Sequence, residues 1–190
     1  MSLTLDSART LMREWVQNPS LRVHMESVAA CMAAYAAEVD PANVERWTIC
    51  GLLHDFDYER HPTQEEHPRV GVAHLRSLGV DDEILDAIMG HAEYTGTPRV
   101  SPMSKHLFAV DELAGFIVAC AKVRPDGLAS LEPASVIKKL KTPAFAAAVS
   151  RSDIAHGLAE LSATTSIDQP THIARCIAAI RQADCLSKGT

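Results

Sequence analysis

The sequence is poor in aromatic residues, in basic residues and in long apolar runs. Aromatic side chains make up 5% of the 190 residues, and the formal net charge is −6. A general nucleic-acid-binding protein needs a concentrated basic face, which this sequence lacks. The longest apolar stretches, such as those at 116–120 and 144–149, are too short to cross a bilayer. We therefore expect a protein whose partners include neither nucleic acid nor a membrane.

The sequence also lacks a secretory signal and the cysteine spacing of a disulfide scaffold. Its first ten residues have no basic start followed by an apolar core. The five cysteines form no CxxC pair and lie in apolar runs, where a thiol behaves as a small hydrophobic group. They are Cys31, Cys50, Cys120, Cys176 and Cys185. We expect buried, reduced thiols and residence in the cytoplasm.

Signals for β-strands are nearly absent. There is little alternation of β-branched residues, and no Asn-Gly or Asp-Gly pair separates alternating runs. Proline instead recurs near the first turn of segments with helical periodicity. We predict an all-α fold with helices at 5–17, 21–38, 43–55, 68–78, 81–91, 102–123, 133–141, 143–149, 152–163 and 170–186.

Length and composition are those of one ordinary globular unit, with 47% apolar and 22% charged residues. The segment Arg-Pro-Asp-Gly at 124–127 is the best candidate boundary, because every candidate ligand precedes it and an alanine-rich region follows. We predict a metal-binding helical core at 1–124 and a C-terminal helical extension at 125–190 that packs on it. The basic run at 138–141 is interpreted as a solvated helix face. The oligomeric state is left open.

The sequence does contain histidines and aspartates set within apolar helical segments. In chain order they are His24, His54, Asp55, His67, His91 and Asp111. A carboxylate buried in such a segment without a partner is costly, and side chains from separate helices can converge on one ion. Imidazole with carboxylate suits Mn, Fe, Co, Ni or Zn. The sequence therefore predicts a site for one or two divalent metal ions.

The order His…His-Asp…Asp resembles the HD-domain superfamily over roughly residues 20–120. Four residues match the ligands that name the family, namely His24, His54, Asp55 and Asp111. The segments EEHPRVG at 65–71 and GHAEYTGTP at 90–98 look like the HPxxG and HHExxDGxGYP segments of the HDIG-like branch, which holds more than one metal. The resemblance implies an HD-domain helical bundle, with His67 and His91 as ligands of a second ion and Asp55 as the bridge.

Two of these residues also have a simpler interpretation. His67 could cap a helix that starts with proline, and His91 could close one, which would leave a single-metal site. In addition, Ala92 stands where the HDIG-like branch has its second histidine. That difference argues against a third metal and against cleavage of cyclic dinucleotides.

The resemblance implies a metal-dependent phosphohydrolase that attacks a small phosphate ester or nucleotide with a metal-activated water. In that chemistry Asp55 belongs to the catalytic set, Lys105 and Arg99 are candidate phosphate contacts, and Glu93 is a candidate for proton transfer. Asp57 or His61 are further candidate helpers. Two other functions stay open: a mixed-valent di-iron oxygenase of the same superfamily, and a non-catalytic sensor of a nucleotide or metabolite.

Overall fold

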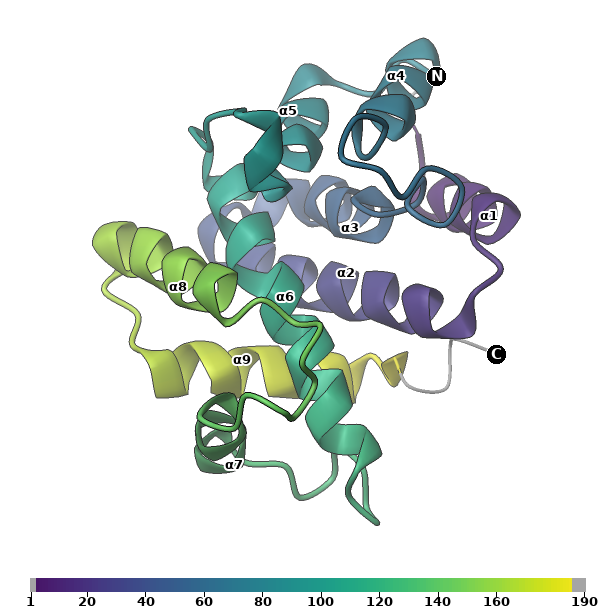
Figure 1. The fold of residues 1–190 in the computed structure, drawn as a ribbon. Helices are drawn as coiled ribbons and strands as arrows, with labels where there is room; N and C mark the ends of the chain where they lie inside the picture. Colours follow the sequence, from purple (N-terminus) through teal and green to yellow (C-terminus); the bar gives the residue numbers. More distant parts are fainter. Residues whose placement is uncertain (1–2, 186–190) are drawn as a thin grey trace.

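The computed structural model describes residues 3–185, and it is all-helical over that range, as predicted (Figure 1). Two short 3₁₀ turns, Pro41–Asn43 and Glu93–Thr95, accompany the α-helices, and no β-strand occurs among the described residues. The α-helices are α1 (Leu5–Trp15), α2 (Pro19–Val39), α3 (Val44–Leu53), α4 (Arg69–Ser77), α5 (Asp82–His91), α6 (Pro102–Lys122), α7 (Pro133–Leu140), α8 (Arg151–Thr165) and α9 (Gln169–Gln182). The end of the helix predicted at 170–186 lies outside the described residues.

Side chains that cap the helices explain where several of them begin. Asn18, Ser101 and Asp168 stand immediately before α2, α6 and α9, and the side-chain oxygen of each accepts backbone N–H bonds from the first turn. Each of these helices has proline at its first or second position. A backbone N–H at these positions has no acceptor within the helix, so the N–H that proline lacks is not missed. These starts are therefore encoded locally, and the sequence predicted them to within two residues.

The prediction of a helix over 143–149 is wrong. Residues 143–148 form turns, and Ala146 has a φ of +45°. The guanidinium of Arg151 donates hydrogen bonds to the carbonyl oxygens of Ala146 at 2.7 Å and Val149 at 2.8 Å, and also bonds that of Phe145. Because these carbonyls are satisfied by a side chain, they need no helical N–H partners. The arginine thus overrides the helical preference of the alanine-rich segment.

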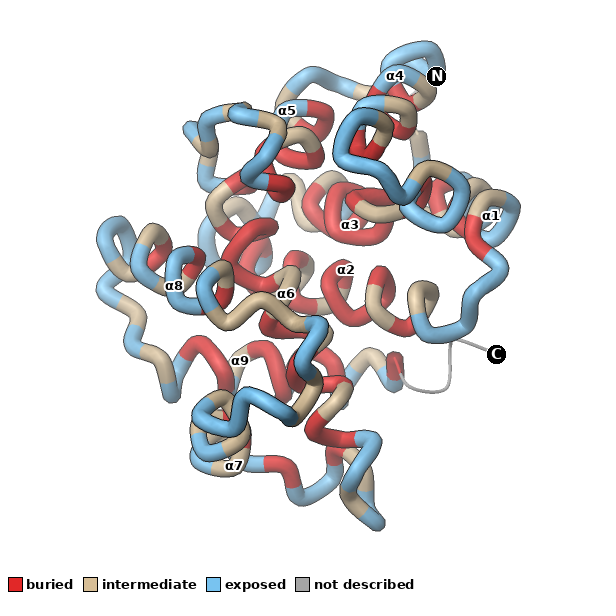
Figure 2. Tube along the Cα trace, viewed as in Figure 1, coloured by how far each residue is buried: buried red, intermediate tan, exposed pale blue. Residues whose placement is uncertain are grey.

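The two longest helices, α2 and α6, form the centre of the molecule, and the others pack around them (Figure 1). Helix α3 lies against α2 so closely that a Cβ atom at Gly51 would lie 2.9 Å from the Cα atom of Ala29. Buried residues gather on the inward sides of α2, α3 and α6 (Figure 2). The three helices that carry or precede His24, Asp55 and Asp111 are therefore held rigidly together.

The C-terminal helices α8 and α9 share one apolar core with α2 and α6. Buried His172 of α9 donates its Nε2 proton to the carbonyl oxygen of Ala109 at 3.0 Å, and its Nδ1 accepts from the hydroxyl of Tyr35 at 2.5 Å. Burial lowers the pKa of His172 to about 4, so the ring stays neutral. These contacts tie α9 to both central helices, while the division between residues 124 and 125 stays a prediction.

Residues 3–185 include all five cysteines, which are buried and form no disulfide, as predicted. The same part of the chain contains no helix that is both long and apolar enough to cross a membrane.

Candidate metal centre

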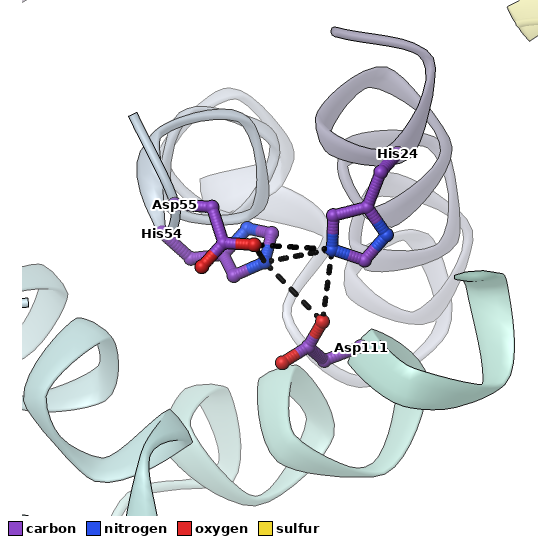
Figure 3. Close-up of side chains that lie close together, drawn as sticks. All are labelled: His24, His54, Asp55 and Asp111. Atoms are coloured by element: carbon purple, nitrogen blue, oxygen red, sulfur yellow. Dashed lines mark hydrogen bonds and ion pairs between the residues drawn. The ribbon is translucent and has the colours of Figure 1, made fainter. Parts of the chain in front are cut away.

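Four of the predicted ligands meet where α2, α3 and α6 come together (Figure 3). His24 lies on α2, His54 and Asp55 follow the last residue of α3, and Asp111 lies midway along α6. The Nε2 atom of His24 is 3.3 Å from Asp55 Oδ2 and 3.1 Å from Asp111 Oδ1. His54 Nε2 lies 3.2 and 3.3 Å from the same two oxygens. We call these four residues group 1.

The remaining two ligands form a second group with the other oxygen of Asp55. His67 stands two residues before α4, and His91 is the last residue of α5. Their Nε2 atoms lie 3.3 and 3.4 Å from Asp55 Oδ1, and 3.3 Å from each other. We call Asp55, His67 and His91 group 2. Asp55 thus presents one carboxylate oxygen to each group, which is the geometry of a bridging ligand.

Hydrogen bonds at the outer nitrogen orient three of the four rings. His54 Nδ1 donates to the carbonyl oxygen of Gly51 at 2.8 Å, and His91 Nδ1 donates to that of Ile88 at 2.5 Å. His67 Nδ1 lies 2.7 Å from Asp57 Oδ1. With the Nδ1 proton held by an oxygen, the Nε2 lone pair points at the cluster. Histidines that bind metals are held in this way.

The spacing of the donor atoms fits a metal ion. The donor atoms of group 1 are 3.1–3.3 Å apart, and donors this far apart around one ion would each lie about 2 Å from it, the usual metal–nitrogen and metal–oxygen distance. Two Nε2 lone pairs that face each other at 3.2 Å, as in His24 and His54, repel unless a proton or a cation lies between them. Group 1 offers four such donors and group 2 offers three.

The carboxylates dominate the electrostatics of both groups. Burial lowers the pKa of His24, but hydrogen bonds to Asp111 and Asp55 outweigh it and raise that pKa to about 9. His67 is likewise buried, and hydrogen bonds to Asp55 and Asp57 raise its pKa to about 9. Burial opposes ionisation of Asp55, yet the charge of His54 and a hydrogen bond from His24 hold its pKa well below the usual range. The site attracts positive charge, supplied by protons or by metal.

Metal binding is expected to weaken as the pH falls. At pH 7 the rings of His24 and His67, with pKa values of about 9, hold protons that an ion must displace. We expect affinity for Mn²⁺ to rise about tenfold per pH unit for each displaced proton from pH 6 to 8, and to level off above pH 9. Calorimetric titration in buffers of different ionisation enthalpy counts the protons. Fewer than one proton released per ion at pH 7 would contradict this expectation.

The two groups open into a cavity of about 380 Å³. Beyond the ligands, its walls carry three aromatic and three acidic side chains, namely Tyr58, Tyr94, Phe108, Glu93, Glu112 and Asp153. No lysine or arginine of residues 3–185 lines it. The cavity therefore holds more carboxylates than the ligand groups use, and it has room for a small molecule next to them.

Three of the helper residues proposed from sequence, namely Glu93, Arg99 and His61, are engaged by other side chains. Glu93 lines the cavity, and its carboxylate pairs with Arg99 at 3.3 Å and with His156 at 2.8 Å. Arg99 also pairs with Glu160 at 2.5 Å and lies over the ring of Phe108. The guanidinium is thus engaged by two carboxylates and does not line the cavity. His61 pairs with Glu66, at 3.2 Å.

The structure does not bring Lys105 to the cavity. It lies on α6 six residues before Asp111, and at about 100° per residue this places it on a different face of the helix. Lys105 lines a separate pocket with Val39, Pro102 and Thr165. The candidate phosphate contact is therefore not part of the cluster.

Sequence reasoning gave too small a role to Asp57 and missed Glu112. Fully buried Asp57 accepts hydrogen bonds from His67 Nδ1 and from the backbone N–H of Gly71, both at 2.7 Å, so it orients a candidate ligand. Glu112 lines the cavity, and burial together with the charge of Asp111 raises its pKa to about 7. The spacing His-Asp-x-Asp at 54–57 was the available signal for Asp57. Glu112 had none beyond its place next to a ligand.

Comparison with protein families identifies the family of the chain. A family model described as HD domain matches residues 22–129, which is more than half of the chain and contains all six candidate ligands. No curated protein and no solved structure matches.

Proposed function

Because the chain belongs to the HD-domain family, we propose that it is a metal-dependent phosphohydrolase that acts on a small phosphate ester. One observation carries the proposal: Asp55 turns one oxygen to group 1 and the other to group 2, at the floor of a cavity of about 380 Å³. Two adjacent metal sites beside a space for substrate suit in-line displacement at phosphorus.

Bound divalent ions would lower the pKa of a coordinated water toward neutrality and neutralise phosphoryl oxygens. The residues of this chain fix where that happens. Hydrogen bonds from His54, His67 and His91 to Gly51, Asp57 and Ile88 keep each ring from turning away. The hydroxyl of Tyr94 donates to the carbonyl oxygen of His67 at 3.1 Å, which fixes the backbone of that ligand as well.

The charge of the cavity favours a substrate with a single phosphate. Glu93, Glu112 and Asp153 add three acidic side chains to the walls. Glu93 pairs with Arg99, and the pKa of Glu112 is about 7, but no lysine or arginine among the described residues lines the cavity to attract further phosphates. A triphosphate would place its further negative charges against these walls, where like charges repel. A phosphate monoester has one phosphate, and its negative charge would lie beside the two ligand groups rather than against the acidic walls.

The test is divalent-dependent phosphate release under air and under nitrogen. Protein stripped with a chelator and reloaded with Mn²⁺, Co²⁺, Ni²⁺, Zn²⁺ or Fe²⁺ is assayed with p-nitrophenyl phosphate, a panel of alkyl phosphates, and ATP. We expect release of inorganic phosphate that needs metal, proceeds equally without oxygen, and is faster for monoesters than for ATP. Absence of release from every ester with every metal would contradict the proposal.

A second candidate is an iron-dependent oxygenase. Group 2 consists of two histidines and one carboxylate, a ligand set used by non-haem iron enzymes that react with oxygen. Iron retained in protein purified without added metal, with substrate consumption that stops under nitrogen, would favour this candidate. A third outcome, stabilisation by phosphate esters without turnover, would favour the sensor.

A further inference from the structure

We propose that a second pocket, between the end of α6 and α7, binds an organic phosphate. This pocket lies at the far end of α6 from the metal centre, and Figure 1 shows α7 at the opposite end of the molecule from α4 and α5. Asp111 and Cys120, which border the two sites, are nine residues apart on α6, roughly 14 Å along its axis. The proposal is independent of the reaction at the metal centre.

The polar wall of this pocket is basic, unlike that of the metal centre. It carries Arg124, Lys138 and Lys139, with the hydroxyls of Ser135 and Thr142 beside them, around a cavity of about 350 Å³. No carboxylate of residues 3–185 lines it. Three cations and two hydroxyl donors on one small cavity, in a chain of net charge −6, match a dianionic head with three terminal oxygens.

The two lysines lack the acidic partners that would neutralise them. Within the described part of the chain, neither Lys138 nor Lys139 forms an ion pair, although Lys139 lies over the ring of Phe145 at 4.4 Å. Arg124 is fixed in place, because it bonds the backbone and side chain of Ser130 and pairs with Asp126 at 3.5 Å. The pocket thus has one positioned guanidinium and two ammonium groups whose charge is available to a ligand.

Part of the pocket lining is apolar, and we refer to it as the apolar floor. It consists of Cys120, Val123 and Leu131, and Val123 is 61% exposed despite being a large hydrophobic side chain. An inorganic anion would leave this surface in contact with water, whereas a phosphate that carries an apolar body would cover it. The combination of a cationic rim and an apolar floor therefore selects an organic phosphate over the free ion.

The sequence predicts that the basic run at 138–141 is a solvated helix face, and the proposal adds a ligand for two of its lysines. Lys138 and Lys139 line the pocket, whereas Lys141, in the same run, does not; Lys138 and Lys141 are both exposed. Lys141 is thus a matched control, because its replacement removes the same charge from the same stretch of chain.

The probe is phenylphosphonate, a dianion with an apolar body that a phosphohydrolase cannot cleave. It is titrated into ¹⁵N-labelled, zinc-loaded protein, and amide shifts at 135–142 and 120–124 report on this pocket separately from shifts near the metal centre. We expect shifts in the α6–α7 pocket and tighter binding of phenylphosphonate than of inorganic phosphate. K138Q and K139Q are each expected to weaken this binding about tenfold, and K141Q to leave it within twofold.

Three results would overturn the proposal. The first is an absence of shifts in this pocket. The second is equal affinity for inorganic phosphate and phenylphosphonate, which would show that the apolar floor plays no part. The third is an equal loss in K141Q, which would show general surface attraction rather than a pocket. The unliganded melting temperatures of the three variants, which we expect to be unchanged, show that a loss of binding is not a loss of folding.

Discussion

Replacing Asp55 by asparagine is expected to remove metal from both ligand groups and to lower phosphate release about a thousandfold. Asp55 is the residue that belongs to both groups, with Oδ2 near His24 and His54 and Oδ1 near His67 and His91. The amide removes the bridging charge and turns one of the two oxygens into a hydrogen-bond donor. A loss of several kcal/mol in the stabilisation of the transition state by the metal ions corresponds to a rate loss of this size.

Metal content per chain and the rate of phosphate release, measured on the same samples, check this expectation. His67→Ala is expected to lower the metal content from two ions toward one, because it affects only group 2. Asp153→Asn is the matched control: it removes a carboxylate from the same cavity but outside both groups, and should keep the full metal content. Two ions per chain retained in Asp55→Asn would refute the bridging role.

Replacing Gly157 by valine is expected to destabilise the protein by about 2–3 kcal/mol. Gly157 is buried on α8, and a Cβ atom there would lie 2.7 Å from the Cα of Ala109 and 3.1 Å from the carbonyl oxygen of Phe108. These are backbone atoms of α6 that no side-chain rotation can move, so α8 must shift away. Since Asp153 on α8 lines the metal-centre cavity, we also expect a weaker interaction with substrate.

Urea unfolding monitored by circular dichroism measures this effect. Ala155→Val is the control, because Ala155 is exposed on the same helix and its replacement adds a β-branched side chain without a close approach. We expect the control to lose less than about 1 kcal/mol. Equal stability of the two variants would show that α8 does not depend on close contact with α6.

The helices were largely predictable because their signals are local. Capping residues and prolines mark the starts of α2, α6 and α9, and apolar residues recur at helical spacing within them. The failure at 143–149 has a specific cause. Arg151, two residues beyond that segment, satisfies its carbonyls, and no helical preference of the alanines could show this.

The helper residues show the same difference between chemical type and position. Arg99 and Lys105 have the charge expected of phosphate contacts, but Glu160 and Glu93 engage the first, and the helical rotation between Lys105 and Asp111 turns the second away. The roles of Asp57 and Glu112 follow from their neighbours in the structure, because Asp57 orients the ring of His67 and Glu112 lines the cavity beside Asp111. A charge is visible in a sequence, but the group that it pairs with is not.

Local sequence signals were enough to predict that this protein is all-helical and that its histidines and aspartates occur in the order of an HD-type metal site. It could do so because helix propensity, capping and the identity of metal-binding side chains are properties of short segments. Three features are visible only in the folded chain: Asp55 faces two ligand groups, the cavity beside them is acidic, and Lys138, Lys139 and Arg124 line a second pocket. Those features depend on which helix faces pack together, and close packing of α2, α3, α6, α7 and α8 sets those distances.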